Sequence, residues 1–125
     1  MTPKRILSVG QCGFDHGGIS RTFRQAFGAE VAAAATQAQA LDWLRKEPFA
    51  LVLVNRVFDA DGDSGVDFIR KLKADAALAA TPVMLVSNYA DAQKEAVAAG
   101  AEPGFGKSSL GRQEMLAGVR PFLAE

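Results

Sequence analysis

The sequence predicts an α/β domain in which five parallel strands form one doubly wound sheet with helices on both faces, a three-layer α/β/α arrangement. Two short runs, residues 50–54 and 82–86, are apolar throughout and lack polar alternation, which is typical of strands buried on both faces. Strand-like and helix-like patterns alternate five times along the chain. The connections are so short that each helix must cross over between parallel strands, and right-handed crossovers then cover both faces of the sheet.

The composition agrees with a single globular domain over residues 1–125, since 49% of the residues are hydrophobic and 22% are charged. The 14 basic and 14 acidic residues balance, which disfavours binding to nucleic acid or to an anionic membrane surface. No apolar run reaches the roughly 18 residues that cross a bilayer, and no signal-peptide core is present, so we expect a cytoplasmic protein. The single cysteine excludes an internal disulfide and leaves no partner cysteine for a structural zinc site.

The first strand is expected at residues 5–9, and the glycine-rich segment that follows it, residues 10–18, is expected to form a loop. A helix comes next, and Gly28 is placed to end it. Its buried stripe, with apolar residues at steps of four, consists of Ile19, Phe23 and Phe27.

A weak second strand is expected at residues 30–35, mostly from its position in the alternation, because alanine favours helix. Thr36 and Gln39 then have the form of a capping box, which begins a second helix. Pro48 ends this helix. The residues of its inner face are Leu41 and Leu44.

The rest of the chain is arranged around the third strand, residues 49–55, which we place near the middle of the sheet. In open sheets of this kind, ligands collect beyond the carboxyl ends of the strands, and that position is occupied by Asn55. After an acidic loop, Ser64 is expected to cap the third helix. The apolar side chains of that helix are Val66, Phe68, Ile69 and Leu72.

The fourth strand is expected at residues 82–87, followed by an alanine-rich helix over residues 89–99 that Asn88 caps. A very short strand around Gly104 and Phe105 leads to the last helix, which Pro121 should kink or stop. The apolar residues of the last helix are Met115, Leu116 and Val119.

Residues 51–55, 65–72, 82–87, 99–102 and 106–107 together resemble the receiver domain of two-component response regulators. The resemblance covers essentially the whole chain and implies the flavodoxin-like fold of those domains. It also implies a role in signal transduction.

The resemblance implies a site built from five groups: two acidic residues after the first strand, a phosphoacceptor aspartate after the third, a hydroxyl and a lysine. An aromatic switch residue lies on the last strand. An amide has neither the charge nor the nucleophilicity of a carboxylate, so we expect neither phosphotransfer nor Mg²⁺ binding, and no enzyme activity. The corresponding residues are Gly10 and Gln11 for the acidic pair, Asn55 for the phosphoacceptor, Ser87 for the hydroxyl, Lys107 for the lysine and Gly104 for the switch residue.

Two functions follow from this degenerate, pseudo-receiver pattern. The first is phosphorylation-independent signalling, in which the last two helices and the last strand bind a partner protein or a second copy of the chain. The alternative is a sensor of anions or small ligands that uses the glycine-rich loop with Ser87 and Lys107, and Asp15 is a candidate substitute acid. We favour a structural role for Lys107, in which it donates hydrogen bonds to Asn55 and Ser87 and locks one conformation.

Three other motifs are too incomplete to support a function. Asp59, Asp61 and Asp63 alternate as at the start of a calcium loop, but the required glycine and glutamate are replaced by Ser64 and Arg70. Cys12, in the loop after the first strand, resembles the catalytic cysteine of small tyrosine phosphatases, but these enzymes need an arginine at the position of Gly18. The glycines of this segment do not form a dinucleotide-binding fingerprint.

Overall fold

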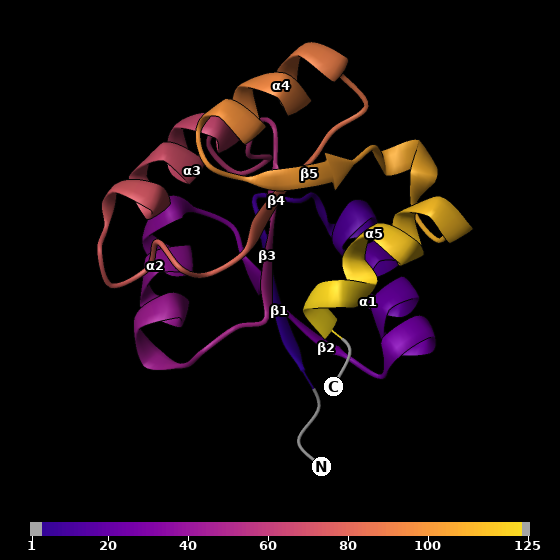
Figure 1. Cartoon of the computed structure of the whole chain (residues 1–125). Coiled ribbons are helices and arrows are strands. Elements are labelled where there is room, and N and C mark those ends of the chain that lie inside the picture. The colour runs from indigo at the N-terminus through magenta and orange to yellow at the C-terminus, as the bar shows by residue number, and fades with distance from the viewer. Residues whose placement is uncertain (1–3, 124–125) are drawn as a thin grey trace.

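The computed structural model describes residues 4–123, and its elements follow one another as strand and helix from end to end (Figure 1). The first half contains β1 (Arg5–Val9), α1 (Gly13–Phe27), β2 (Glu30–Ala34), α2 (Gln37–Lys46) and β3 (Leu51–Asn55). The second half contains α3 (Gly65–Ala74), β4 (Val83–Val86), α4 (Ala90–Ala98), β5 (Glu102–Phe105), a short 3-10 turn (Lys107–Ser109) and α5 (Gln113–Leu123).

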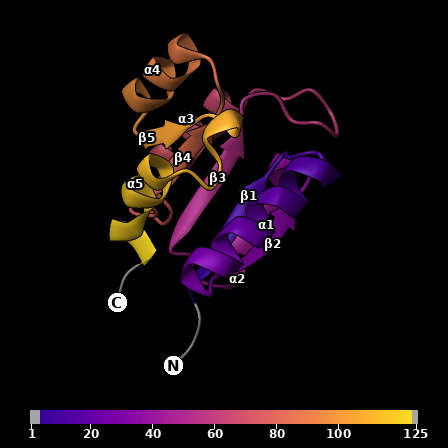
Figure 2. The same ribbon diagram turned by 90° about the vertical axis from the view of Figure 1, so that its right-hand side faces the viewer.

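The five strands form one parallel sheet in the order β2-β1-β3-β4-β5, which confirms the predicted doubly wound α/β fold. One face of the sheet is covered by α1 and α5, and the other by α2, α3 and α4 (Figures 1 and 2). β3 is the middle strand, as predicted. Among the described residues, no helix is long and apolar enough to span a bilayer.

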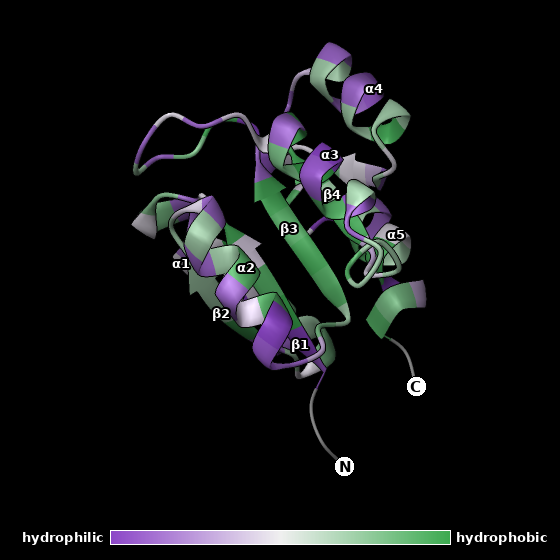
Figure 3. Cartoon of the chain, turned by 90° about the vertical axis from the view of Figure 1, so that its left-hand side faces the viewer, coloured by the Kyte–Doolittle hydropathy of each residue, from purple (hydrophilic) through white to green (hydrophobic). Residues whose placement is uncertain are grey.

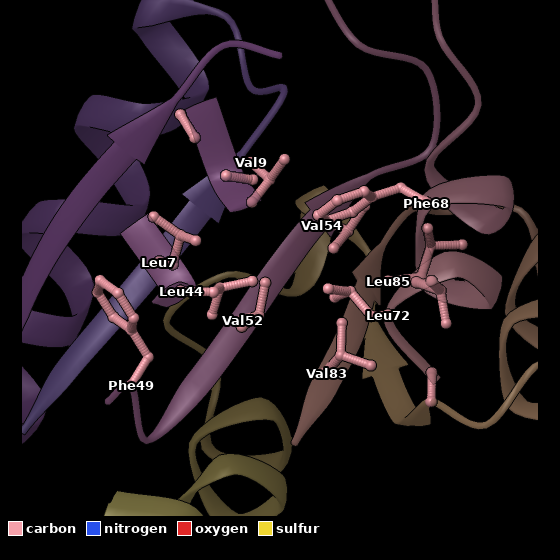
Figure 4. Packing of buried hydrophobic residues seen from close by; sticks show 14 of the residues in the cluster. Leu7, Val9, Leu44, Phe49, Val52, Val54, Phe68, Leu72, Val83 and Leu85 are labelled. Carbon is pink, nitrogen blue, oxygen red and sulfur yellow. The ribbon is translucent and has the colours of Figure 1, made fainter. Parts of the chain in front are cut away.

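All five residues of β3 are buried, and the strand divides the core into two clusters. Figure 3 shows the hydrophobic colour of this strand in the middle of the sheet. Val52 and Val54 point to the face covered by α2, α3 and α4, where they pack with Leu44, Phe68 and Leu72 (Figure 4). The alternate residues of β3 belong to the cluster beneath α1 and α5. The members of that cluster include Ile6, Phe23, Leu51, Leu53, Met84 and Val119.

The segment after β1 was predicted to be a loop through residue 18, and this prediction was wrong. Helix α1 begins at Gly13, because the Cys12 side chain caps its first turn by accepting a hydrogen bond from the Asp15 backbone N–H at 3.4 Å. Ile19 and Phe23 are buried, and their packing outweighs the low helix propensity of the glycines in the first turns. Only residues 10–12 remain as the loop.

Two helix boundaries also differ from the prediction. Asn88 does not cap α4, since Tyr89 holds the N-cap position without a side-chain hydrogen bond, and the Asn88 side chain instead accepts hydrogen bonds from Ser108. Pro121 was predicted to kink or stop the last helix, and of these two outcomes a stop at the proline is wrong, because α5 continues to Leu123. The proline lies in the last turn, and the buried Leu123 side chain beyond it anchors the helix end.

Candidate functional site

The carboxyl ends of β1, β3 and β4 surround an open crevice of about 580 Å³. This is the edge of the sheet at which ligands bind in related architectures. The lining comes from the start of α1, from the loops that follow β3 and β4, and from the segment after β5. The polar side chains that line the crevice include Cys12, Asp15, Asn55, Arg56, Ser87 and Lys107.

The Asn55 side chain, which is only 7% exposed, organises the base of this crevice as a hydrogen-bond donor. Its Nδ2 donates to the backbone carbonyl of Gly10 at 3.0 Å and to that of Val57 at 2.7 Å. Both amide hydrogens are therefore used to tie β3 to the loop after β1 and to the loop that follows it. A carboxylate at this position has no hydrogen to donate and would face two carbonyl oxygens instead.

The backbone around Asn55 requires two glycines. Gly10 has a φ of +75°, and a Cβ on it would overlap the Phe58 ring. Gly65 begins α3 directly against the backbone of Asn55, and a Cβ there would overlap the Asn55 carbonyl oxygen. Gly10 therefore cannot be replaced by aspartate without strain and a clash, although that change would formally restore one acid of a receiver site.

Lys107 forms an ion pair with Asp15, with 2.8 Å between Nζ and Oδ2. The predicted hydrogen bonds from Lys107 to Asn55 and Ser87 were wrong. Asn55 uses its N–H groups on backbone carbonyls, and the Ser87 hydroxyl accepts a hydrogen bond from the Tyr89 backbone N–H. Because α1 begins early, Asp15 lies in its first turn and can reach the lysine.

The Lys107 ammonium lowers the pKa of the Asp15 carboxyl group, mainly through their hydrogen bond, and partial burial opposes this effect. The carboxylate therefore supplies Lys107 with a counter-charge from within the chain. At the outer edge of the crevice, the Arg56 guanidinium lies over the Tyr89 ring, 4.6 Å from its centroid.

The residues at this site fit Mg²⁺ poorly, because this ion is held by carboxylate and phosphate oxygens and the carboxylates that line the crevice are only those of Asp15 and Asp59. Gly10 has no side chain, and both polar atoms of the Gln11 carboxamide are buried without a hydrogen-bond partner among the described residues. Asn55 points its N–H groups at carbonyls, and Asp15 is neutralised by Lys107. Within residues 4–123, no group of three or more His, Cys, Asp or Glu side chains is arranged to hold a metal ion.

The ion pair leads to a prediction about acid stability. The folded-state pKa of Asp15 is lowered, so its stabilisation is present above the unfolded-state pKa and is lost as the pH falls through the folded value. Asp15→Asn should cost less than about 1 kcal/mol at pH 7, because the Asp15 and Lys107 side chains are 24% and 39% exposed.

Urea titrations of the wild type and of Asp15→Asn should differ above about pH 4 and converge below it. Asp61→Asn, a change in the exposed acidic loop, is the matched control. A constant difference between wild type and Asp15→Asn at all pH values would contradict the ion pair.

One residue near the site, Gln93, was not predicted from the sequence. Gln93 of α4 hydrogen-bonds to backbone groups of Leu85, Ser87 and Gly104, the last of which was predicted to hold the switch position. The adjacent Pro103 and Gly104 within an edge strand were the available signal, because this pair is typical of an irregular strand that needs other hydrogen-bond partners.

Solved structures of response regulators are similar to this one. A chain assigned as a response regulator from Chloroflexus aurantiacus J-10-fl superposes with a TM-score of 0.86 at 21% identity, over 99% of this chain and 100% of that one. The signal receiver domain of the DNA-binding response regulator merR from Colwellia psychrerythraea 34H gives 0.81 at 21% identity, over 98% and 99%. The chemotaxis response regulator CheY4 of Vibrio cholerae gives 0.74 at 20% identity, over 98% and 100%.

No protein-family profile matches the sequence, and no curated protein matches it either. At identities near 20%, the likeness to solved structures concerns the fold. The chain therefore has the five-stranded α/β fold of the receiver domains of response regulators.

Proposed function

We propose that this chain is a pseudo-receiver that acts in signal transduction by protein–protein interaction, without phosphorylation, metal binding or catalysis. The observation that carries the proposal is the double hydrogen bond from Asn55 to the carbonyls of Gly10 and Val57. These hydrogen bonds support a structural role for the neutral Asn55 amide in the crevice. An aspartate, the residue that accepts phosphate in receivers, could not donate either of them.

Phosphoryl transfer to a side chain needs a nucleophile and nearby positive charge that can neutralise the phosphate. Here the nucleophile position holds an amide, and the cation of Lys107 is already paired with Asp15. The same pair argues against the alternative function as an anion sensor. The glycine-rich loop that this alternative requires is largely the first turns of α1.

The surface best suited to a partner lies over α4 and β5. A shallow hollow of about 340 Å³ is lined by Gln93, Lys94, Val97, Pro103 and Gly104. Val97, the one large apolar residue of α4, is 45% exposed. The lining of the hollow is mainly apolar, and a continuous apolar surface is typical of an interaction site.

A second copy of the chain is the occupant that this surface fits. In a twofold dimer the same patch meets itself, so a patch with both charge signs can be self-complementary. Lys94 of the hollow is exposed, as is Glu102 next to Pro103 in the chain, so both charge signs occur near the apolar residues of this surface. The chain as a whole carries no net charge that would oppose self-association.

Val97→Glu should abolish this association, because it places a carboxylate at the apolar centre of the interface, where it would be desolvated without a partner. Sedimentation velocity over a concentration series measures the effect, and circular dichroism checks the fold. Ala98→Glu, which adds the same charge at the next exposed position of α4, should have little effect. If Val97→Glu sediments like the wild type, or if the wild type is monomeric throughout, this interface is ruled out.

A further inference from the structure

The Gln93 carboxamide bridges three elements of the fold. Its Nε2 donates to the backbone carbonyls of Leu85 at 2.9 Å and Ser87 at 3.0 Å, with a longer contact of 3.4 Å to that of Phe105. Its Oε1 accepts a hydrogen bond from the Gly104 backbone N–H at 3.2 Å. One side chain of α4 therefore satisfies polar backbone groups on both β4 and β5.

These backbone groups need such a partner because the β4–β5 ladder is irregular. Met84 pairs with Glu102 and Val86 pairs with Phe105, so two residue steps on β4 face three on β5. The additional residue lies at Pro103–Gly104, where the proline has no N–H to donate. The N–H of Gly104 is directed to Gln93 instead.

The Gln93 side chain also packs against Gly104, in space that a side chain at residue 104 would occupy. A Cβ on residue 104 would overlap the Leu85 carbonyl oxygen and would lie 2.9 Å from Gln93 Oε1. The absence of a side chain at this position is thus what allows the carboxamide to lie against the strand. An aromatic residue there, as in receivers that switch, cannot coexist with this arrangement.

The rest of α4 is weakly anchored. Ala96 is its only buried residue, so the helix contributes little apolar area to the core. Ala92 packs partly buried against the same core cluster, and the hydrogen bonds of Gln93 add to these small apolar contacts in holding the helix. Val97 lies one turn further along the same side, next to the hollow that Gln93 also lines.

We propose that Gln93 is a positioning residue that fixes α4 against the β5 bulge and so holds the α4–β5 surface permanently in its binding form. This inference rests on the proposed function and adds its regulation: the surface needs no phosphorylation signal because a side chain inside the fold already sets it.

The test uses the full chain and the variant Gln93→Met, which keeps the length and most of the volume of the side chain but removes its hydrogen bonds. The control is Glu95→Met, an exposed change on the same helix outside the hollow. Two quantities are measured: amide hydrogen exchange and self-association by sedimentation velocity. In Gln93→Met, exchange at Gly104 and along residues 96–99 should accelerate by about tenfold or more, since two or more hydrogen bonds are lost. Self-association should weaken by a similar factor, and Glu95→Met should change neither quantity.

Unchanged exchange in Gln93→Met would overturn the role of the side chain in holding α4. Faster exchange with undiminished self-association would overturn its role in presetting the surface. Failure of the proposed interface itself has a different signature, in which Val97→Glu leaves association intact while exchange still accelerates in Gln93→Met.

Discussion

Replacing Leu51 by alanine is expected to lower the free energy of unfolding by about 2 to 5 kcal/mol, a large fraction of the stability of a small domain. Leu51 is fully buried in the middle strand, opposite Ile6 of β1, and packs in the cluster beneath α1 and α5. Removal of three side-chain carbons leaves a cavity there, because neighbouring strands on both sides prevent the backbone from closing it.

The measurement is a urea titration, with Lys46→Ala on the exposed side of α2 as the control. The control should change stability by less than about 0.5 kcal/mol. A loss of under about 1 kcal/mol for Leu51→Ala would argue against a central position for β3.

Asn55→Asp is expected to cost about 2 to 4 kcal/mol at neutral pH, even though the two side chains have nearly the same shape. The new carboxylate is buried, loses both donated hydrogen bonds and faces the carbonyl oxygens of Gly10 and Val57. Protonation of the new carboxyl group restores one donor. The destabilisation should therefore become smaller as the pH is lowered.

Urea titrations at pH 7 and at pH 5 measure this effect, with Asn55→Ala as the uncharged comparison. Both variants lose the hydrogen bonds, but only the aspartate variant should improve at the lower pH. An Asn55→Asp protein as stable as the wild type at pH 7 would show that a cation, such as Lys107 released from Asp15, can reach the site. That result would contradict the claim that the crevice requires a neutral hydrogen-bond donor at position 55.

The strand pattern and its consequences were predictable from the sequence. Runs such as residues 51–55 have no helical period and no polar face, and burial on both faces is the only arrangement that suits them. The position of Asn55 at the carboxyl end of the middle strand follows directly from that burial. Likewise, Gly28 ends α1 with a φ of +64°, as its place after the apolar stripe indicated.

The start of α1 was not predictable from local preference, because several glycines in one segment favour a loop and only tertiary packing of Ile19 and Phe23 decides otherwise. The same error hid the Asp15–Lys107 pair. A pair of residues 92 positions apart in the chain can be matched only when the helix that carries Asp15 is in place.

The constraint on Gly10 is also a property of the folded backbone. The resemblance to receiver domains suggests that adding Gly10→Asp and Gln11→Asp to Asn55→Asp restores partial phosphotransfer activity. The positive φ of Gly10 and the Phe58 ring beside it oppose this route, because an aspartate there is strained and its Cβ overlaps the ring. At Gly10 the backbone conformation, and not only the absence of a side chain, therefore disfavours an acidic residue.

The most direct test of phosphorylation independence is the intact mass of the protein after incubation with acetyl phosphate and Mg²⁺, for the wild type and for Asn55→Asp, alongside a response regulator known to accept this donor. Circular dichroism first establishes that the variant is folded under the conditions used. We predict no gain of roughly 80 Da, the mass of one phosphoryl group, on a hydroxylamine-labile site in either protein. Such a gain in the wild type would contradict the proposed function, and an efficient gain in Asn55→Asp would show that Asp15 or the Asp59–Asp63 loop already serves a metal in the crevice.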